Sequence, residues 1–109
     1  MIRGAVYRVD LGNAKRGHEQ RGRRYGVLVS PTDSPLSVVT IVPTSTSARP
    51  ALHRPLIDFG NGPTLALVDQ LRVLDICYLS QMAGYLTRDE FAQVEHAISQ
   101  YLGLVPSQH

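Results

Sequence analysis

The sequence has little cysteine: it contains one, Cys77. It also has no long apolar run and no common cofactor motif, and these absences exclude several classes of protein. Cys77 has no partner for an internal disulfide, and without a second cysteine or clustered histidines it offers no thiolate metal site. We expect it to be a small core residue. No segment approaches the roughly 18 consecutive apolar residues that a membrane span needs. We therefore expect neither a metal site nor a membrane partner.

Sequence motifs for nucleotide and zinc chemistry are also missing. There is no GxxxxGK[ST] phosphate loop, no GxGxxG, no HExxH and no GxSxG, which argues against nucleotide hydrolysis and zinc-dependent catalysis. The chain enters patterned sequence directly after Met1-Ile2-Arg3-Gly4, without the basic and apolar regions of a secretory signal. We therefore expect a cytoplasmic protein that needs no cofactor.

The composition is that of a globular protein with an uneven charge distribution. The 109 residues fit one domain, residues 1–109, and 43% of them are hydrophobic. Residues 1–30 carry seven Lys/Arg against two acids, whereas the remainder carries four against seven. Five basic residues fall within ten positions: Lys15, Arg16, Arg21, Arg23 and Arg24. Such density suits phosphate contact and indicates nucleic acid, although a solvated loop that binds nothing has the same charge.

Short β-branched segments separated by turn residues dominate the first two thirds of the chain. They predict strands over residues 5–10, 25–30, 37–42, 52–59, 64–68 and 71–74. We expect Pro43 to end the third strand and Pro55 to place the fourth at a sheet edge. Between the first two strands, residues 12–24 are expected to form a long polar loop, whereas residues 69–70 show no clear break.

The end of the chain changes to helical spacing. Apolar residues recur there three or four positions apart, at Phe91, Val94, Ile98, Tyr101 and Leu102. A capping box of Thr87 and Glu90 and a left-handed stop at Gly103 fit the two ends of this helix, and Asp89 favours its positive start. Short strands followed by one helix predict a mainly β fold, a small closed β-barrel with a C-terminal α-helix.

The loop before the second strand and the hydroxyls after the third are the candidates for chemistry. RNA carries its own nucleophile, the 2′-hydroxyl, so a base, an acid and a cation suffice to cut it. Arg24 is the best-placed cation, because a strand root is rigid and a guanidinium matches two phosphate oxygens, although it can equally pair with a surface acid. Ser45 either donates to that phosphate or caps local backbone. His18 and Glu19 are candidates for proton transfer.

Several sequence fragments occur in an order that resembles the MazF/PemK toxins. The family's opening RG-x-[IV]-[WY]-x-V-[DN] is matched from Arg3-Gly4 through residues 6–11, and its G-[SH]-E-Q loop by Gly17-His18-Glu19-Gln20. Its Arg-Pro before an apolar strand is matched by Arg24-Tyr25, with tyrosine in place of proline. V-P-x-[TS] is matched by Val42-Pro43-Thr44-Ser45, and [DE]-Q-[IVL]-[RK] by Asp69-Gln70-Leu71-Arg72. The resemblance covers nearly the whole chain.

This resemblance implies an SH3-like β-barrel of the CcdB/MazF kind that works as a homodimer. It implies a type II toxin that inhibits translation and growth by cutting single-stranded RNA without a metal, through a 2′,3′-cyclic phosphate and a 5′-hydroxyl end. It also implies an antitoxin whose C-terminal segment occupies the RNA groove. The catalytic pair of the family is matched by Arg24 and Ser45, a serine where threonine is usual, and Thr44 or Thr46 can supply the hydroxyl instead. RNA contacts are expected from Lys15, Arg16, Gln20, Arg21, Arg23 and Thr44.

Two other functions fit the same fold. CcdB-like toxins use this barrel to bind DNA gyrase without enzymatic activity, and the loop motif at residues 17–20 argues against that alternative. A catalytically silent nucleic-acid-binding or protein-binding module is the other alternative, and Ser45 and Tyr25 would then mark its drift from an active ancestor.

Overall fold

The computed structural model describes residues 1–12, 22–31 and 37–104. Seven strands form one sheet in the order β4-β5-β3-β2-β1-β7, and β6 pairs with β3. Their bounds are β1 Ala5–Asp10, β2 Arg23–Leu28, β3 Val38–Ser45, β4 Leu56–Ile57, β5 Thr64–Ala66, β6 Arg72–Asp75 and β7 Leu79–Tyr85. Two 3₁₀ turns, η1 Val68–Gln70 and η2 Ile76–Tyr78, precede and follow β6, and the helix α1 spans Arg88–Tyr101.

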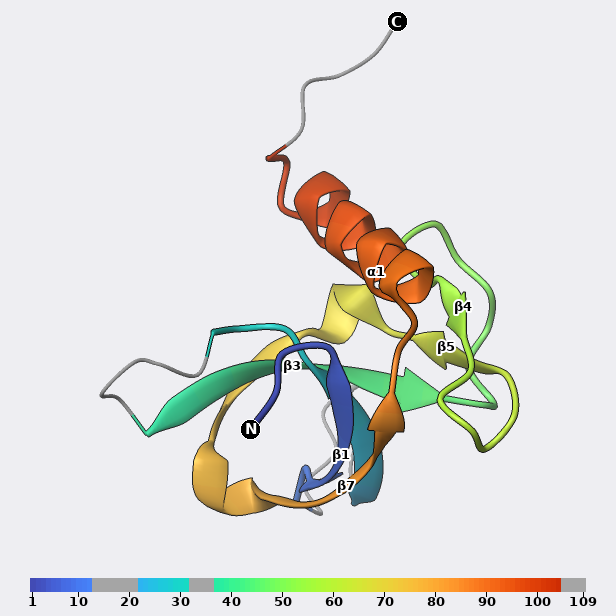
Figure 1. Cartoon of the computed structure of the whole chain (residues 1–109). Coiled ribbons are helices and arrows are strands. Elements are labelled where there is room, and N and C mark those ends of the chain that lie inside the picture. The colour runs from blue at the N-terminus through green and yellow to red at the C-terminus, as the bar shows by residue number, and fades with distance from the viewer. Residues whose placement is uncertain (13–21, 32–36, 105–109) are drawn as a thin grey trace, which may run out of the picture.

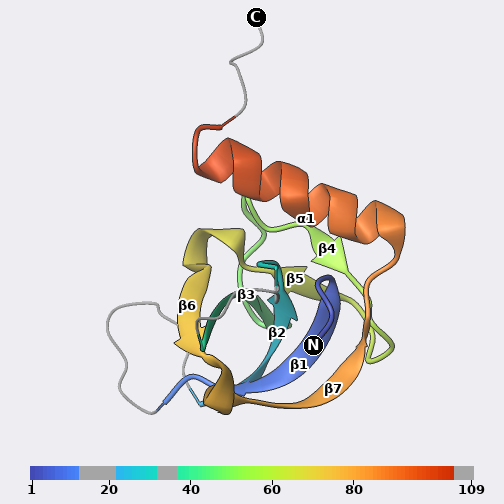
Figure 2. The same ribbon diagram turned by 60° about the vertical axis from the view of Figure 1, so that its left-hand side comes forward.

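The sheet curls into a half-barrel, and α1 lies across one side of it (Figures 1 and 2). Alternating residues of β1 face two apolar clusters, because successive strand side chains point to opposite faces. Ala5, Tyr7 and Val9 belong to one cluster with residues of β2, β3, β6 and β7. Val6 belongs to the other, which includes Val94 of α1. The expected mainly β fold with a C-terminal helix is therefore confirmed.

The N-terminal Arg3-Gly4 pair of the MazF/PemK-like opening ties the sheet to the helix. The Arg3 guanidinium donates to the Val29 carbonyl at 2.8 Å and to Glu95 of α1 at 2.7 Å, and it lies 4.7 Å from the centre of the Phe91 ring. Gly4 has a φ of 90°, a left-handed conformation that favours glycine. This part of the motif is structural.

Both predicted ends of the helix are confirmed. The Thr87 hydroxyl accepts the Glu90 N–H at 3.1 Å, and the Glu90 carboxylate accepts the Thr87 N–H at 2.9 Å, which is a complete capping box. Asp89 lies in the first turn, as predicted. Gly103 has a φ of 72°, the left-handed conformation that stops a helix.

Two strand boundaries near the expected loop were wrong. β2 begins at Arg23, because Arg23 and Arg24 pair with Asp10 and Val9 of β1, so the polar loop ends earlier than predicted. β3 continues through Pro43 to Ser45 instead of ending at the proline. Pro43 has no N–H to donate, but its carbonyl accepts a hydrogen bond from the Leu67 N–H at 2.8 Å, and β3 continues beyond it to pair with β5.

Three further expectations need correction. Only Leu56–Ile57 of the predicted strand at 52–59 pairs, as the edge strand β4, and η1 interrupts the predicted continuous segment at residues 69–70. The strand β7 was not predicted. Cys77 is exposed on η2 rather than buried, because its N–H donates to Asp75 at 3.0 Å in a tight turn.

Candidate active site

A pocket of ≈ 210 Å³ opens where β2 begins and β3 ends. Three segments contribute to it: the start of β2, the end of β3 and the turn that leads into β5. Its lining residues are Arg23, Arg24, Tyr25, Thr44, Ser45, Thr46, Phe59, Asn61, Gly62 and Thr64. We call it the β2–β3 pocket.

The register of the sheet brings Arg24 and the hydroxyl residues together. The pairing of β2 with β3 begins at Gly26, opposite Pro43, and Arg24 and Ser45 line the pocket just beyond that pair. On its other side Arg24 pairs with Val9 of β1. Arg24 is therefore held at the root of a paired strand, which suits the preorganised charge that a catalytic site requires.

The three consecutive hydroxyl residues at the end of β3 differ in what their oxygens already bind. The buried Ser45 hydroxyl accepts the N–H groups of Ser47 at 3.2 Å and Ala48 at 3.1 Å. The buried Thr44 hydroxyl donates to the Tyr25 carbonyl at 3.3 Å. Thr46 is exposed and makes no side-chain hydrogen bond within the described residues. Its hydroxyl is the most available of the three to a ligand.

The described lining of the β2–β3 pocket contains two arginines and no acidic residue. Arg23 and Arg24 are both exposed, so their guanidinium groups reach solvent beside the hydroxyls. Two adjacent positive charges next to hydroxyl donors provide what a phosphate diester needs: compensation of its charge and hydrogen bonds to its oxygens. The pocket is chemically suited to a phosphate.

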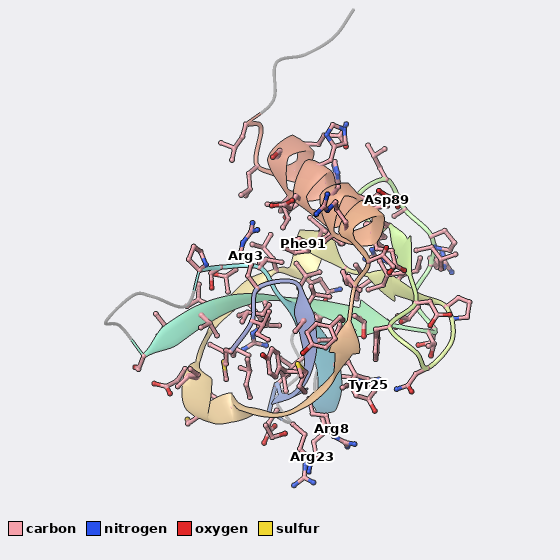
Figure 3. All side chains as sticks on the ribbon, in the orientation of Figure 1. Arg3, Arg8, Arg23, Tyr25, Asp89 and Phe91 are labelled. Atoms are coloured by element: carbon pink, nitrogen blue, oxygen red, sulfur yellow. The ribbon has the colours of Figure 1, made fainter. Side chains whose placement is uncertain are left out.

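Tyr25, the departure from the MazF/PemK pattern, forms one wall of the pocket. Its ring packs against Phe59 with centroids 5.2 Å apart. The Arg8 guanidinium lies 5.7 Å from the centre of the same ring. In Figure 3, Tyr25, Arg8 and Arg23 are grouped on the side of the molecule remote from α1. The tyrosine thus replaces a rigid proline with an aromatic surface beside the cations.

The turn before β5 contributes lining residues that sequence analysis did not place in the site: Phe59, Asn61, Gly62 and Thr64. The sequence Gly60-Asn61-Gly62-Pro63 indicated a tight turn but nothing about which strand ends it would meet. It reaches the site because β5 pairs with Thr44 and Ser45 of β3. That long-range pairing has no signal in the local sequence.

The pocket brings together the five described residues that sequence analysis assigned to the site: Arg23, Arg24, Thr44, Ser45 and Thr46. The other six, Lys15, Arg16, His18, Glu19, Gln20 and Arg21, lie outside the described residues. The two ends of the segment that carries them are adjacent. The Leu11 N–H donates to the Gly22 carbonyl at 2.9 Å, immediately before Arg23.

The Asp69-Gln70 motif lies outside the pocket and fixes a neighbouring loop. Arg54 binds Asp69 through two parallel hydrogen bonds of 3.0 and 2.9 Å, and its third nitrogen donates to the Arg49 carbonyl at 2.9 Å. The hydrogen bond from Arg54 lowers the pKa of the Asp69 carboxyl below its usual value. This pair anchors the segment that follows Thr46.

Two kinds of site are absent from the described part of the chain. No three His, Cys, Asp or Glu side chains gather there in a way that would hold a metal ion. No helix in residues 1–12, 22–31 and 37–104 is long and apolar enough to cross a membrane.

Comparison with known proteins gives concordant matches. A family model described as "PemK-like, MazF-like toxin of type II toxin-antitoxin system" matches residues 2–102. The Mycobacterium tuberculosis (strain ATCC 25618 / H37Rv) protein named "Putative toxin Rv3098A/RVBD_3098A" is 59% identical over 105 residues, which are 95% of this chain and 99% of that protein.

Two solved structures have the same fold at low sequence identity. Mycobacterium tuberculosis toxin MazF-mt6 superposes with a TM-score of 0.75 at 18% identity, over 94% of this chain and 99% of that one. An endoribonuclease in complex with its cognate antitoxin, from a mycobacterial species, has a TM-score of 0.79 at 22% identity, over 98% and 99% of the two chains.

Proposed function

Since the chain belongs to the PemK-like, MazF-like toxins of type II toxin–antitoxin systems, we propose that it is an endoribonuclease that cuts single-stranded RNA in the cytoplasm. The observation that carries the proposal is the β2–β3 pocket, where two arginines meet the three hydroxyl residues at the end of β3 without an acidic neighbour in the described lining. Unpaired RNA is the proposed substrate because its backbone and bases are both accessible to a shallow surface site.

In the proposed reaction, the 2′-hydroxyl of the RNA attacks the adjacent phosphorus. The bond between phosphorus and the 5′-oxygen breaks, which leaves a 2′,3′-cyclic phosphate and a 5′-hydroxyl. The extra negative charge develops on the non-bridging phosphate oxygens, and the proposed role of Arg24, which lines the pocket, is to bind two of them with its planar fork. This chemistry requires no metal ion. His18 and Glu19 remain the proposed groups for proton transfer.

We assign the hydroxyl contact with the phosphate to Thr46. Its side chain is exposed at the pocket and has no hydrogen bond to the described residues, so contact with a phosphate breaks no existing bond. The Ser45 hydroxyl instead accepts hydrogen bonds from the backbone N–H groups of Ser47 and Ala48, and it thereby shapes the turn that presents Thr46. Arg23 and Thr44 are the proposed flanking contacts with RNA, together with Lys15, Arg16, Gln20 and Arg21.

We further propose that the protein acts as a homodimer and is held inactive by an antitoxin. One structural neighbour is by its name an endoribonuclease bound to its cognate antitoxin. An acidic segment of an antitoxin would bind the same arginines as RNA, and the two would therefore compete. Release of the antitoxin then exposes the pocket and leads to RNA cleavage, arrest of translation and inhibition of growth.

The proposal is tested with purified protein and single-stranded RNA in the presence of EDTA. We expect fragments with 5′-hydroxyl ends for the wild type and intact RNA for Arg24→Ala, with circular dichroism showing that the variant stays folded. RNA that survives the wild-type protein contradicts the proposal. So do fragments that carry a 3′-hydroxyl, because the RNA would then have been cut by another nucleophile.

A gyrase poison of the CcdB kind is distinguished by what it damages. Brief expression of the protein in cells, followed by mapping of new RNA 5′ ends, reports the cleaved motif and the target class together. We expect fragmented transcripts and unbroken DNA. Broken DNA with whole transcripts would favour the gyrase-binding function instead.

A further inference from the structure

A second pocket lies beside the β2–β3 pocket and shares Arg23 with it. Its volume is ≈ 330 Å³, and it is formed by β1, the start of β2, η2 and the start of β7. The lining residues are Arg8, Val9, Asp10, Arg23, Cys77, Tyr78 and Ser80. We call it the β1–β7 pocket. None of its residues other than Arg23 belongs to the site described above.

The sheet register explains why these side chains meet. Asp10 pairs with Arg23, and Arg8 pairs with Tyr25, so all four side chains project from the same face of β1 and β2. Ser80 of β7 donates its hydroxyl to the Arg8 carbonyl at 3.4 Å, which holds β7 against β1 here. Figure 3 shows Arg8, Arg23 and Tyr25 together on this side of the molecule. The two pockets therefore adjoin on one surface.

The charges of the β1–β7 pocket fit a ligand with both an anion and hydrogen-bond donors. Arg8 and Arg23 form no salt bridge with any acid in the described part of the chain. Asp10 uses one carboxylate oxygen to accept the Gly12 N–H at 2.9 Å, which leaves the other for a ligand. A bare anion would be repelled by Asp10, whereas a nucleotide offers a phosphate to the arginines and base N–H groups to the carboxylate.

An aromatic ring completes the site. Tyr78 lines the β1–β7 pocket and is 50% exposed, so its ring is open to stacking. Stacking of an unpaired base on such a ring tolerates any base, because every base has an aromatic face. Two cations, one acceptor and one ring are the groups by which proteins hold a nucleotide of single-stranded RNA.

We infer that the β1–β7 pocket binds a second nucleotide of the RNA, with its phosphate between Arg8 and Arg23 and its base against Tyr78. The inference rests on the proposed function, since it takes RNA as the ligand. Arg23 lines both pockets, so one RNA strand passes from the phosphate that is cut to the next nucleotide without leaving the protein surface. Recognition then extends beyond the cleaved bond.

Cys77 provides a direct readout of occupancy, because it is the only cysteine and lines this pocket. The Asp75 carboxylate raises the pKa of the Cys77 thiol, so alkylation with iodoacetamide is run at alkaline pH. An RNA methylated at every 2′-oxygen withstands that pH and lacks the nucleophile for cleavage. We expect a saturating 2′-O-methyl hexanucleotide to slow alkylation at least about fivefold, and a dinucleotide at the same concentration to slow it less.

The variant Arg8→Gln tests the cation, and Arg88→Gln is its control. Both substitutions remove one positive charge from an exposed arginine, but Arg88 lies at the start of α1, outside both pockets. For Arg8→Gln we expect the Kd of the hexanucleotide to rise about tenfold, with Cys77 no longer protected at the concentration that protects the wild type. Arg88→Gln keeps the wild-type Kd and protection.

Failure of this inference is distinguishable from failure of the proposed function. If unmodified RNA is cut but bound hexanucleotide leaves Cys77 alkylation unchanged, the β1–β7 pocket is not an RNA site and the enzymatic function stands. Equal protection in Arg8→Gln and wild type also overturns the inference, as does protection by poly-glutamate but not by RNA. If RNA protects Cys77 and yet is never cut, the proposed catalysis is wrong and the binding site stands.

Discussion

At the scale of single residues, the proposed reaction depends on Arg24 as a bidentate partner of the phosphate. Lysine keeps the charge but loses the planar fork, so we expect Arg24→Lys to lower kcat by about 10²-fold or more, in line with the loss of one preorganised donor. The measurement is the initial rate of cleavage of a fluorescent single-stranded RNA. Arg88→Lys, outside the site, is the matched control and should keep wild-type kcat.

Removal of the hydroxyl at Thr46 and at Ser45 should have different effects on activity and on stability. Thr46→Val preserves shape and removes only the hydroxyl, and we expect a fall in kcat of about tenfold or more with an unchanged Tm. Ser45→Ala leaves the N–H groups of Ser47 and Ala48 without their acceptor, which should cost about 1–2 kcal/mol of stability. Rates and thermal unfolding are measured on both variants. A Thr46→Val protein with full activity would return the catalytic role to Ser45.

At the scale of structural elements, the segment after Thr46 is anchored to η1 by the Arg54–Asp69 pair. Because Arg54 lowers the pKa of Asp69 in the folded protein, the pair adds stability above the unfolded pKa of Asp69, near 4. That stability is lost as the pH falls through the lowered pKa. Asp69→Asn should therefore be less stable than wild type at pH 7, by about 1–3 kcal/mol, and the difference should shrink toward pH 2–3.

Urea unfolding of both proteins at a series of pH values checks this linkage. A constant stability difference across the whole range would show that Asp69 acts through packing and not through its charge. The rate of RNA cleavage by Asp69→Asn should fall together with its stability, because the anchored segment follows the turn that presents Thr46.

At Gly84 the strand β7 passes close to the backbone of Phe59, in the turn before β5. A Cβ added at Gly84 would collide with the Phe59 carbonyl, which is backbone and cannot rotate away. We expect Gly84→Ala to cost about 1–3 kcal/mol and to displace the Phe59 wall of the pocket. Gly26→Ala is the comparison, since its Cβ would meet mainly the flexible end of Ile41. The expectation is wrong if thermal unfolding shows that Gly84→Ala lowers the Tm no more than Gly26→Ala does.

The elements also show what the sequence could and could not predict. Period-two patterning and cap residues located β1 and both ends of α1, because these are local signals. The extension of β3 past Pro43 was missed, since it depends on a partner 24 residues later, the Leu67 N–H. For the site, Arg24 and the hydroxyls were predictable from motifs, whereas Phe59 and Tyr78 reach their pockets through long-range strand pairing and turns.

At the scale of the whole molecule, structural and ligand-binding roles are on different sides. The helix α1 packs on one side of the sheet, where Arg3 binds Glu95, whereas Arg8 and Arg23 lie on the side remote from it (Figure 3). Arg8, Arg23 and Arg24 thus form one cationic surface across two pockets. We propose a single RNA strand as the ligand, because its repeating charge matches such a surface.

This arrangement predicts a strong dependence of RNA binding on salt. Three phosphate contacts on a single strand give a slope of log K against log salt of about −2, and further contacts make it steeper. Fluorescence anisotropy with a 2′-O-methyl hexanucleotide between low and moderate salt measures the slope. Arg8→Gln should reduce its magnitude by about 0.7, and Arg88→Gln should leave it unchanged. A slope near zero would mean that phosphates are not the groups bound.

The central claim is that this chain cuts RNA by using the RNA's own 2′-hydroxyl at the β2–β3 pocket. The most direct measurement takes an RNA with one mapped cleavage position and replaces only the 2′-hydroxyl at that position by hydrogen. Mass spectrometry of the products in EDTA should then show a 2′,3′-cyclic phosphate from the unmodified RNA and no cleavage at the modified position. Cleavage of the 2′-deoxy position at an undiminished rate would contradict the account.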